Sequence, residues 1–229
     1  MFARFTALFC LLCWSCSIGR AEPFQTAPAS VTVFLKAEAA DSEAALDAMR
    51  KELARLMEYG NYELLWMDPN QARANAHGPL VVVELQGACN PSYGITSLAG
   101  MNPEMIHGRP LASSQVVSGR VLPFVWLHCE TLNDFLGAAL ACASAACREM
   151  LYGRAMARLI AHELYHFLVQ THHHTKSGVT QPQITPAEVL AVSLAFDHRA
   201  SLNLRASQRP PLGAGNRGGM VPSLPREVR

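Results

Sequence analysis

Two histidines and a glutamate in one short stretch are the residues best suited to chemistry. His162, Glu163 and His166 form the pattern HExxH, within a stretch (147–169) whose apolar residues recur at helical spacing. Residues four positions apart lie on one face of a helix, so both imidazoles can bind one metal ion at about 2.0–2.1 Å. Glu163 starts about 100° away around the axis, which places its carboxylate beside a metal-bound water. Zinc lowers the pKa of its water towards 7 and the carboxylate can take the proton, which suits amide hydrolysis.

A further protein ligand is expected from the histidine cluster immediately downstream. If the helix continued, His173 would share the face of His166 but would lie about 10 Å further along the axis. One ion cannot span that distance and still bind His162. The helix must therefore end near residues 169–171, and the chain must turn, before a third histidine can reach the metal.

The HExxH stretch resembles the zincin metallopeptidases, over roughly residues 147–200 and most strongly over 162–174. In the metzincin pattern, HExxHxxGxxH, the third histidine corresponds to His172, and Val169 stands at the glycine position. The stretch also resembles small exported bacterial HExxH proteins, in which a histidine precedes a Gly-Val pair by four residues. That pattern implies His174 as the third ligand, ahead of Gly178. The resemblance implies a Zn²⁺ ion and peptide-bond hydrolysis, with ligands His162, His166 and either His174 or His172, and with Glu163 as general base.

Glu188 is the alternative third ligand. It lies 22 residues after His166, a range in which gluzincins place a ligand glutamate on a second helix. The same residue fits a capping box, with Thr185 as the N-cap and Pro186 at the first helical position. A capping glutamate is engaged with its own backbone, so we expect Glu188 to cap a helix over residues 186–203.

The remaining elements predict an α+β fold, in which a small mixed β-sheet packs on the HExxH helix and a C-terminal helix follows. Runs of β-branched and apolar residues predict strands at 31–37, 62–66 and 80–85, and a Ser-Gly hairpin signal at 118–119 predicts two more at 115–117 and 120–129. Amphipathic spacing predicts a helix over 42–59. On the HExxH helix, Arg154 and Arg158 are expected to form a solvated face. The edge of the sheet beside the site can bind an extended peptide by backbone pairing.

The first 21 residues have the features of a signal peptide. Arg4 provides a positive charge, an apolar run follows over 5–18, and small residues precede position 22. We therefore expect a secreted or periplasmic protein, with one zincin-like domain over residues 22–206. A Pro/Gly/Arg-rich tail over 207–229 is expected to be disordered. No later apolar run is long enough to predict a membrane span.

Four cysteines remain after the signal peptide: Cys89, Cys129, Cys142 and Cys147. An even number in an exported chain predicts disulfides, and four cysteines allow three connectivities. We expect Cys89 to pair with Cys129, which would join two strand ends, and Cys142 to pair with Cys147 across a local loop.

Composition narrows the function further. Hydrophobic residues make up 50% of the chain and charged residues 16%, which excludes an intrinsically disordered protein. Nineteen Lys and Arg against eighteen Asp and Glu leave no basic excess for a nucleic-acid partner. The sequence thus predicts an exported zinc metallopeptidase with a peptide or protein substrate. The alternative is an exported zinc- or peptide-binding protein without catalysis.

Overall fold

The computed structural model describes residues 27–38, 40–67, 78–92 and 108–208. The signal peptide expected at 1–21 lies outside these residues, as does the expected tail from position 209 onward. Ser207 and Gln208 were placed in that tail, but Ser207 ends a helix and Gln208 is its C-cap. Across the part of the chain that the structure describes, no helix has both the length and the apolar character needed to cross a membrane.

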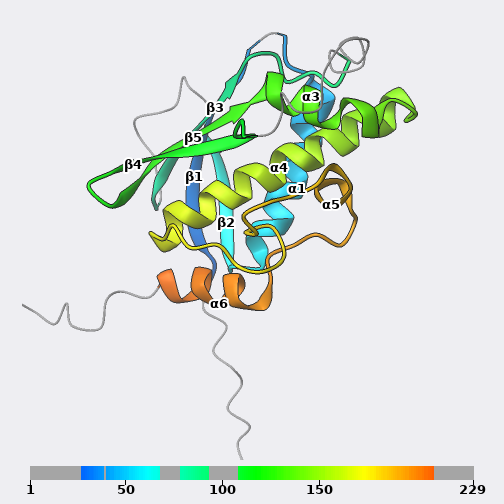
Figure 1. Ribbon diagram of the computed structural model, residues 1–229. Coiled ribbons are helices and arrows are strands. Elements are labelled where there is room, and N and C mark those ends of the chain that lie inside the picture. Colours follow the sequence, from blue (N-terminus) through cyan, green and yellow to red (C-terminus); the bar gives the residue numbers. More distant parts are fainter. Residues whose placement is uncertain (1–26, 39, 68–77, 93–107, 209–229) are drawn as a thin grey trace, which may run out of the picture.

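Within these residues, five strands form one sheet in the order β2-β1-β3-β5-β4 (Figure 1). The strands are β1 (Ala29–Lys36), β2 (Tyr62–Met67), β3 (Leu80–Gln86), β4 (Ala112–Val117) and β5 (Arg120–His128). All neighbouring strands are parallel except β4, which forms an antiparallel hairpin with β5. The mixed sheet confirms the predicted α+β fold, and it leaves β4 as an edge strand.

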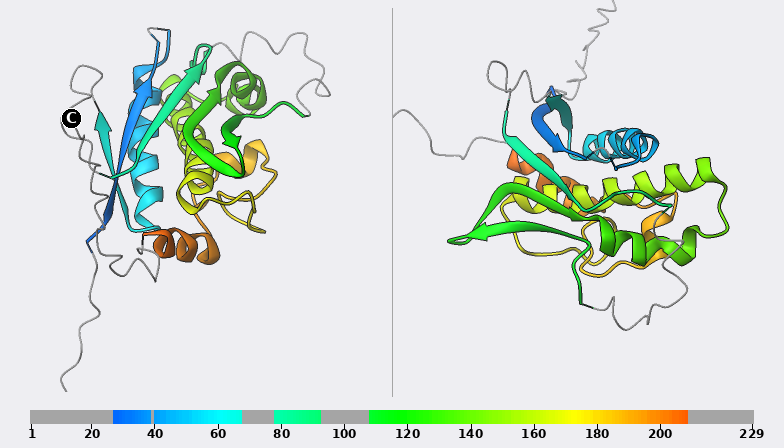
Figure 2. Two further views of the ribbon diagram at one scale, coloured as in Figure 1. Left: turned by 90° about the vertical axis from the view of Figure 1, so that its left-hand side faces the viewer. Right: turned by 90° about the horizontal axis from the view of Figure 1, so that it is seen from above.

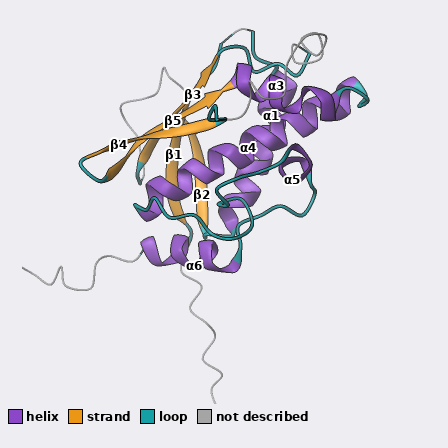
Figure 3. Ribbon diagram, in the orientation of Figure 1, coloured by secondary structure: helices purple, strands orange, loops and turns teal. Residues whose placement is uncertain are grey.

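The described helices lie to one side of this sheet (Figures 2 and 3), and the two longest of them pack directly on it. They are α1 (Glu43–Glu58), α3 (Cys129–Leu140), α4 (Ala145–Val169), α5 (Pro186–Leu190) and α6 (His198–Ser207). The strand side chains on that face, such as Val33, Val83 and Val125, are fully buried. The HExxH residues lie in the last turns of α4, which packs against α1, β4 and β5. The helix α3 was not predicted from the sequence.

Gly153 allows α1 and α4 to approach closely. A Cβ at this position would lie 2.2 Å from the Ala45 carbonyl oxygen and 2.7 Å from the Ala48 Cβ, well inside van der Waals contact. We therefore expect Gly153→Ala to lower the free energy of unfolding by about 2 kcal/mol through overpacking, although alanine gains about 1 kcal/mol in helix propensity. Urea denaturation of the variant measures this, and Ala48→Gly in the same chain should recover part of the loss. A Gly153→Ala protein more stable than wild type would contradict the close crossing.

The single helix predicted over 186–203 is wrong, because the chain forms two helices with an irregular segment between them. The predicted capping box is confirmed at the start of α5. The break follows from two arginines on α4. Arg158 Nη1 donates to the Val189 carbonyl at 2.6 Å and Arg154 Nη1 donates to the Leu190 carbonyl at 3.2 Å. These are the carbonyls that the next helical turn would have used, and Asp197 then caps a new helix by accepting from the Ala200 amide.

Arg158 also corrects the expectation of a solvated arginine face on α4. Its side chain is 1% exposed, and it donates to Glu52 on α1 as well as to the α5 segment. Arg158 therefore links α4 to both α1 and α5 through hydrogen bonds of its buried side chain.

The disulfide expected between Cys89 and Cys129 is confirmed. These residues follow β3 and β5, whose parallel pairing ends at Gln86 and His128. The disulfide therefore joins the chain just beyond the ends of these two neighbouring strands. Closing a loop of 40 residues stabilises the fold by about 4 kcal/mol in the chain-entropy model. The pairing expected between Cys142 and Cys147 is wrong: both are free thiols. Cys147 belongs to the first turn of α4, where its amide donates to the N-cap Ser144, while Cys142 is exposed in the preceding turn.

Candidate metal centre

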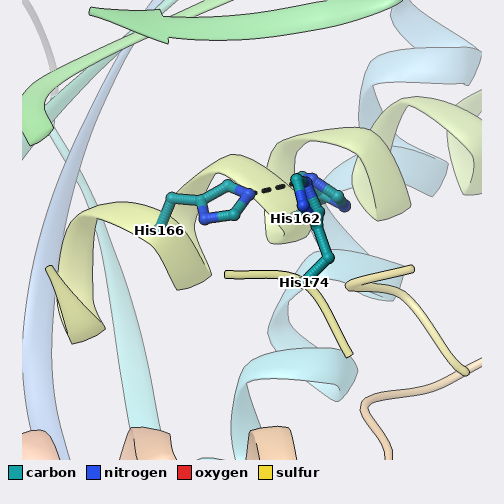
Figure 4. Close-up of side chains that lie close together, drawn as sticks. All are labelled: His162, His166 and His174. Atoms are coloured by element: carbon teal, nitrogen blue, oxygen red, sulfur yellow. Dashed lines mark hydrogen bonds between the residues drawn. The ribbon is translucent and has the colours of Figure 1, made fainter. Parts of the chain in front are cut away.

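Three histidine side chains converge beside the C-terminal end of α4 (Figure 4). His162, His166 and His174 each offer one ring nitrogen, and these atoms all lie within 4.8 Å of one another. The Nε2 atoms of His162 and His166 are 3.0 Å apart. The cluster could hold a metal ion, and it contains both histidines of the HExxH pattern.

The hydrogen bonds at Nδ1 determine which ring nitrogens are free. His162 Nδ1 lies 2.9 Å from the Val179 carbonyl oxygen, and His166 Nδ1 lies 2.7 Å from the Thr171 carbonyl oxygen. A carbonyl can only accept, so each Nδ1 carries the hydrogen and each neutral ring has a lone pair on Nε2. Two such lone pairs facing each other at 3.0 Å repel unless a cation or a proton lies between them. The pair is therefore arranged for a shared cation.

Burial keeps these rings neutral. It lowers the pKa of His162 from its usual range, and it lowers the pKa of His166 to about 4, with the nearby His162 as the second cause. Hydrogen bonds to the carbonyls oppose both shifts. A neutral imidazole is the form that binds metal, so near pH 7 protons compete only weakly for these two sites.

The turn that brings back the third histidine begins at Gln170. This residue ends α4 in the left-handed conformation, with φ of 53°. That conformation costs a non-glycine residue about 1–2 kcal/mol. The Gln170 side chain offsets the cost, because its amide both donates to and accepts from the backbone of Val121 on β5. The helix thus ends where the metal geometry required, although Val169 occupies the position at which metzincins have glycine.

A second turn, over residues 174–180, places both His174 and the carbonyl that orients His162. Thr175 and Thr180 are buried and joined by a backbone hydrogen bond and by a contact between their hydroxyls. Gly178 has φ of 79°, and a Cβ there would lie 2.5 Å from the Ala195 carbonyl oxygen. The Val179 amide donates to that same carbonyl. The Gly-Val pair therefore has a physical role, since it presents the Val179 carbonyl to His162.

The other candidate ligands lie outside the cluster. His172 and His173 are exposed in the loop after α4, and neither belongs to the group of converging histidines. Glu188 is exposed, and one of its carboxylate oxygens accepts hydrogen bonds from the amide and the hydroxyl of Thr185. The structure therefore places His174, rather than His172 or Glu188, beside the HExxH histidines.

Glu163 is a buried carboxylate with a partner on the edge strand. It is 8% exposed, and its Oε2 accepts a hydrogen bond of 2.7 Å from the Ser114 hydroxyl of β4. Its negative charge is close enough to His166 to oppose the lowering of that residue's pKa. A second acceptor oxygen, Oε1, remains on the carboxylate for a proton or a donor.

Comparison with protein-family models, curated proteins and solved structures found no match to this chain. The geometry of the site is therefore the basis on which a function is inferred.

Several residues of the site carried no signal in the sequence. The backbone carbonyls of Thr171 and Val179 have no side-chain signature, although Gly178 marks the turn beside one of them. Ser114 lies 49 positions from Glu163, and only the packing of β4 on α4 brings the two together.

Proposed function

We propose that this protein is an exported zinc-dependent metallopeptidase with a zincin-like site. The convergence of His162, His166 and His174 carries the proposal, because two of these rings present lone pairs on Nε2 towards a common point. A buried carboxylate, Glu163, follows the first of them on the same helix. Three imidazoles with an adjacent carboxylate are the donor set and the base that metal-assisted amide hydrolysis needs.

The donor set favours zinc. Imidazole suits Zn²⁺, and three protein ligands with one open position are typical of catalytic zinc sites. Tetrahedral geometry with bonds of about 2.05 Å separates two ligand nitrogens by about 3.4 Å, close to the 3.0 Å between Nε2 of His162 and Nε2 of His166. The ring nitrogens of the three histidines lie within 4.8 Å of one another. His174 is exposed, so its side chain can rotate to bring its nitrogen closer to the other two.

The residues of the chain divide the proposed reaction between them. When bound, zinc lowers the pKa of a coordinated water towards 7 and polarises the scissile carbonyl. Glu163 takes the proton from the attacking water and then donates it to the leaving amine nitrogen. The carbonyls of Val179 and Thr171 hold the two α4 imidazoles in the tautomer and orientation that binding requires.

The proposed substrate is a peptide or protein in an extended conformation. Among the strands that the structure describes, β4 pairs with β5 alone, and it contributes Ser114 to the site, so an added strand would run beside Glu163. Secretion or export to the periplasm is part of the proposal. The Cys89–Cys129 disulfide supports it, because such bonds persist in oxidising compartments.

Removal of the metal tests the proposal directly. The purified protein should contain about one zinc per chain and should cleave a peptide library, and a chelator should abolish cleavage. A metal that binds only the folded state, at a free concentration 100 times its Kd, adds about 2.7 kcal/mol to the free energy of unfolding. For a domain of this size, chelation should then lower Tm by about 5–10 °C.

Two histidine variants identify the third ligand in the same assay. His174→Ala should lose most of the chelator-sensitive Tm shift, whereas His172→Ala, an exposed residue of the same loop, should retain it. A shift that survives in the His174 variant and disappears in the His172 variant would assign the ligand to His172 instead. A protein without metal, or one that chelation does not affect, would refute the zinc site.

A further inference from the structure

Ser114 touches the proposed general base without belonging to the metal cluster. Its hydroxyl donates to Oε2 of Glu163 at 2.7 Å, across the interface between β4 and α4. Glu163 is 8% exposed, and a buried carboxylate is costly without a hydrogen-bond donor. The contact therefore stabilises one orientation of the Glu163 side chain.

The position of Ser114 in β4 determines which face of the strand its side chain points to. Successive residues of a strand point to opposite faces, and the neighbouring Ser113 contacts Nε2 of His128 instead, at 3.1 Å. The ladder with β5 is irregular between Ser114 and Val116. Ser114 itself is still in register with Val125 of β5, whose side chain is fully buried, so regular alternation already directs the serine towards the helix that carries Glu163.

We infer that Ser114 is a positioning residue for Glu163, an inference that rests on the proposed peptidase function. Its hydroxyl holds Oε2, so that Oε1 is the oxygen that receives the proton of the attacking water. Because Ser114 belongs to the edge strand along which an extended peptide would add, the strand that holds the substrate also orients the base.

Kinetics of three single variants test this role. Ser114→Ala should lower kcat by about 10–100-fold, the loss typical of an orienting hydrogen bond at a metal site, with KM changed by less than about two-fold. Ser114→Thr keeps the hydroxyl and should recover most of the rate. Ser113→Ala, the matched control on the opposite face of β4, should have wild-type kinetics. An unchanged kcat in Ser114→Ala, or an equal loss in the Ser113 control, would overturn the inference.

A measurement without turnover separates this inference from the proposed function. In thermal unfolding, Ser114→Ala should lower Tm in the wild-type background and much less in a Glu163→Ala background, since the partner is already absent. Additive shifts would show that the contact does not form, and would overturn the inference even in an active enzyme. Coupled shifts in a protein that binds zinc but cleaves nothing would support the contact, while refuting the peptidase proposal and the positioning role with it.

Discussion

Glu163→Gln is expected to lower kcat for peptide hydrolysis by about 10²–10⁴-fold, the usual contribution of a general base. Glutamine has nearly the same shape as glutamate, and its amide oxygen can still accept the Ser114 hydroxyl. It cannot take a proton from water near neutral pH. The three histidines are unchanged, so zinc content and the chelator-sensitive Tm should remain those of the wild type.

A glutamine at position 188 provides the control for this experiment. Glu188 is exposed and serves the capping box of α5, a role that glutamine also fills. Glu188→Gln should therefore keep both zinc and activity. Full activity in the Glu163 variant would contradict its assignment as the base. Zinc binding without any cleavage by the wild type would favour the alternative function, a zinc- or peptide-binding exported protein that does not catalyse.

The HExxH pair could be predicted from the sequence because it depends on one local property, the helical repeat. His162 and His166 lie one turn apart on any helix, and the apolar spacing around them already indicated that helix. The third histidine was different. His172 and His174 lie in the same loop, and the choice between them depends on the left-handed turn at Gln170 and on the buried pair of Thr175 and Thr180. No sequence period reports such a turn.

The strands of the sheet were likewise predictable from local patterns, namely β-branched and apolar runs and the hairpin signal between β4 and β5, but their order was not. Pairing between β1 and β3, or between β3 and β5, joins segments far apart in the chain. The break between α5 and α6 shows the same limit within one segment. Residues 186–203 have a helical pattern and a good N-cap, yet Arg158 and Arg154 donate hydrogen bonds to the carbonyls of Val189 and Leu190. Tertiary hydrogen bonds thus override the local preference for a longer helix.

Arg158→Met is the substitution expected to have the largest effect on stability. It keeps much of the volume of the side chain but removes donors to Glu52 and to the carbonyls of Val189 and Val192. Loss of one partner of a buried ion pair costs about 3–5 kcal/mol. Glu52 retains Arg55 as a second partner, so we expect a loss of about 3 kcal/mol in the free energy of unfolding, measured by urea denaturation.

Arg55→Ala is the matched control, because Arg55 pairs with the same glutamate from an exposed position on α1. The Arg55 end of this pair faces solvent, which screens its charge, so this variant should be nearly as stable as wild type. Equal losses of unfolding free energy in Arg158→Met and Arg55→Ala would contradict the prediction, because the buried arginine would then contribute no more than the exposed one. Glu52→Gln combined with Arg158→Met should cost less than the two single losses added, since both variants remove the same interaction between Arg158 and the Glu52 carboxylate.

The effect of Arg158→Met should also reach the metal centre, although Arg158 is not a member of the histidine cluster. Arg158 holds the start of the segment that joins α5 to α6. That segment continues to Ala195 and Phe196, which pair with Val179 and Gly178, and the Val179 carbonyl orients His162. We therefore expect weaker zinc binding in the Arg158 variant, measured by competition with a chelator at a temperature at which the protein stays folded. Unchanged zinc affinity in a destabilised protein would show that the turn at Gly178 holds its carbonyl without support from α5.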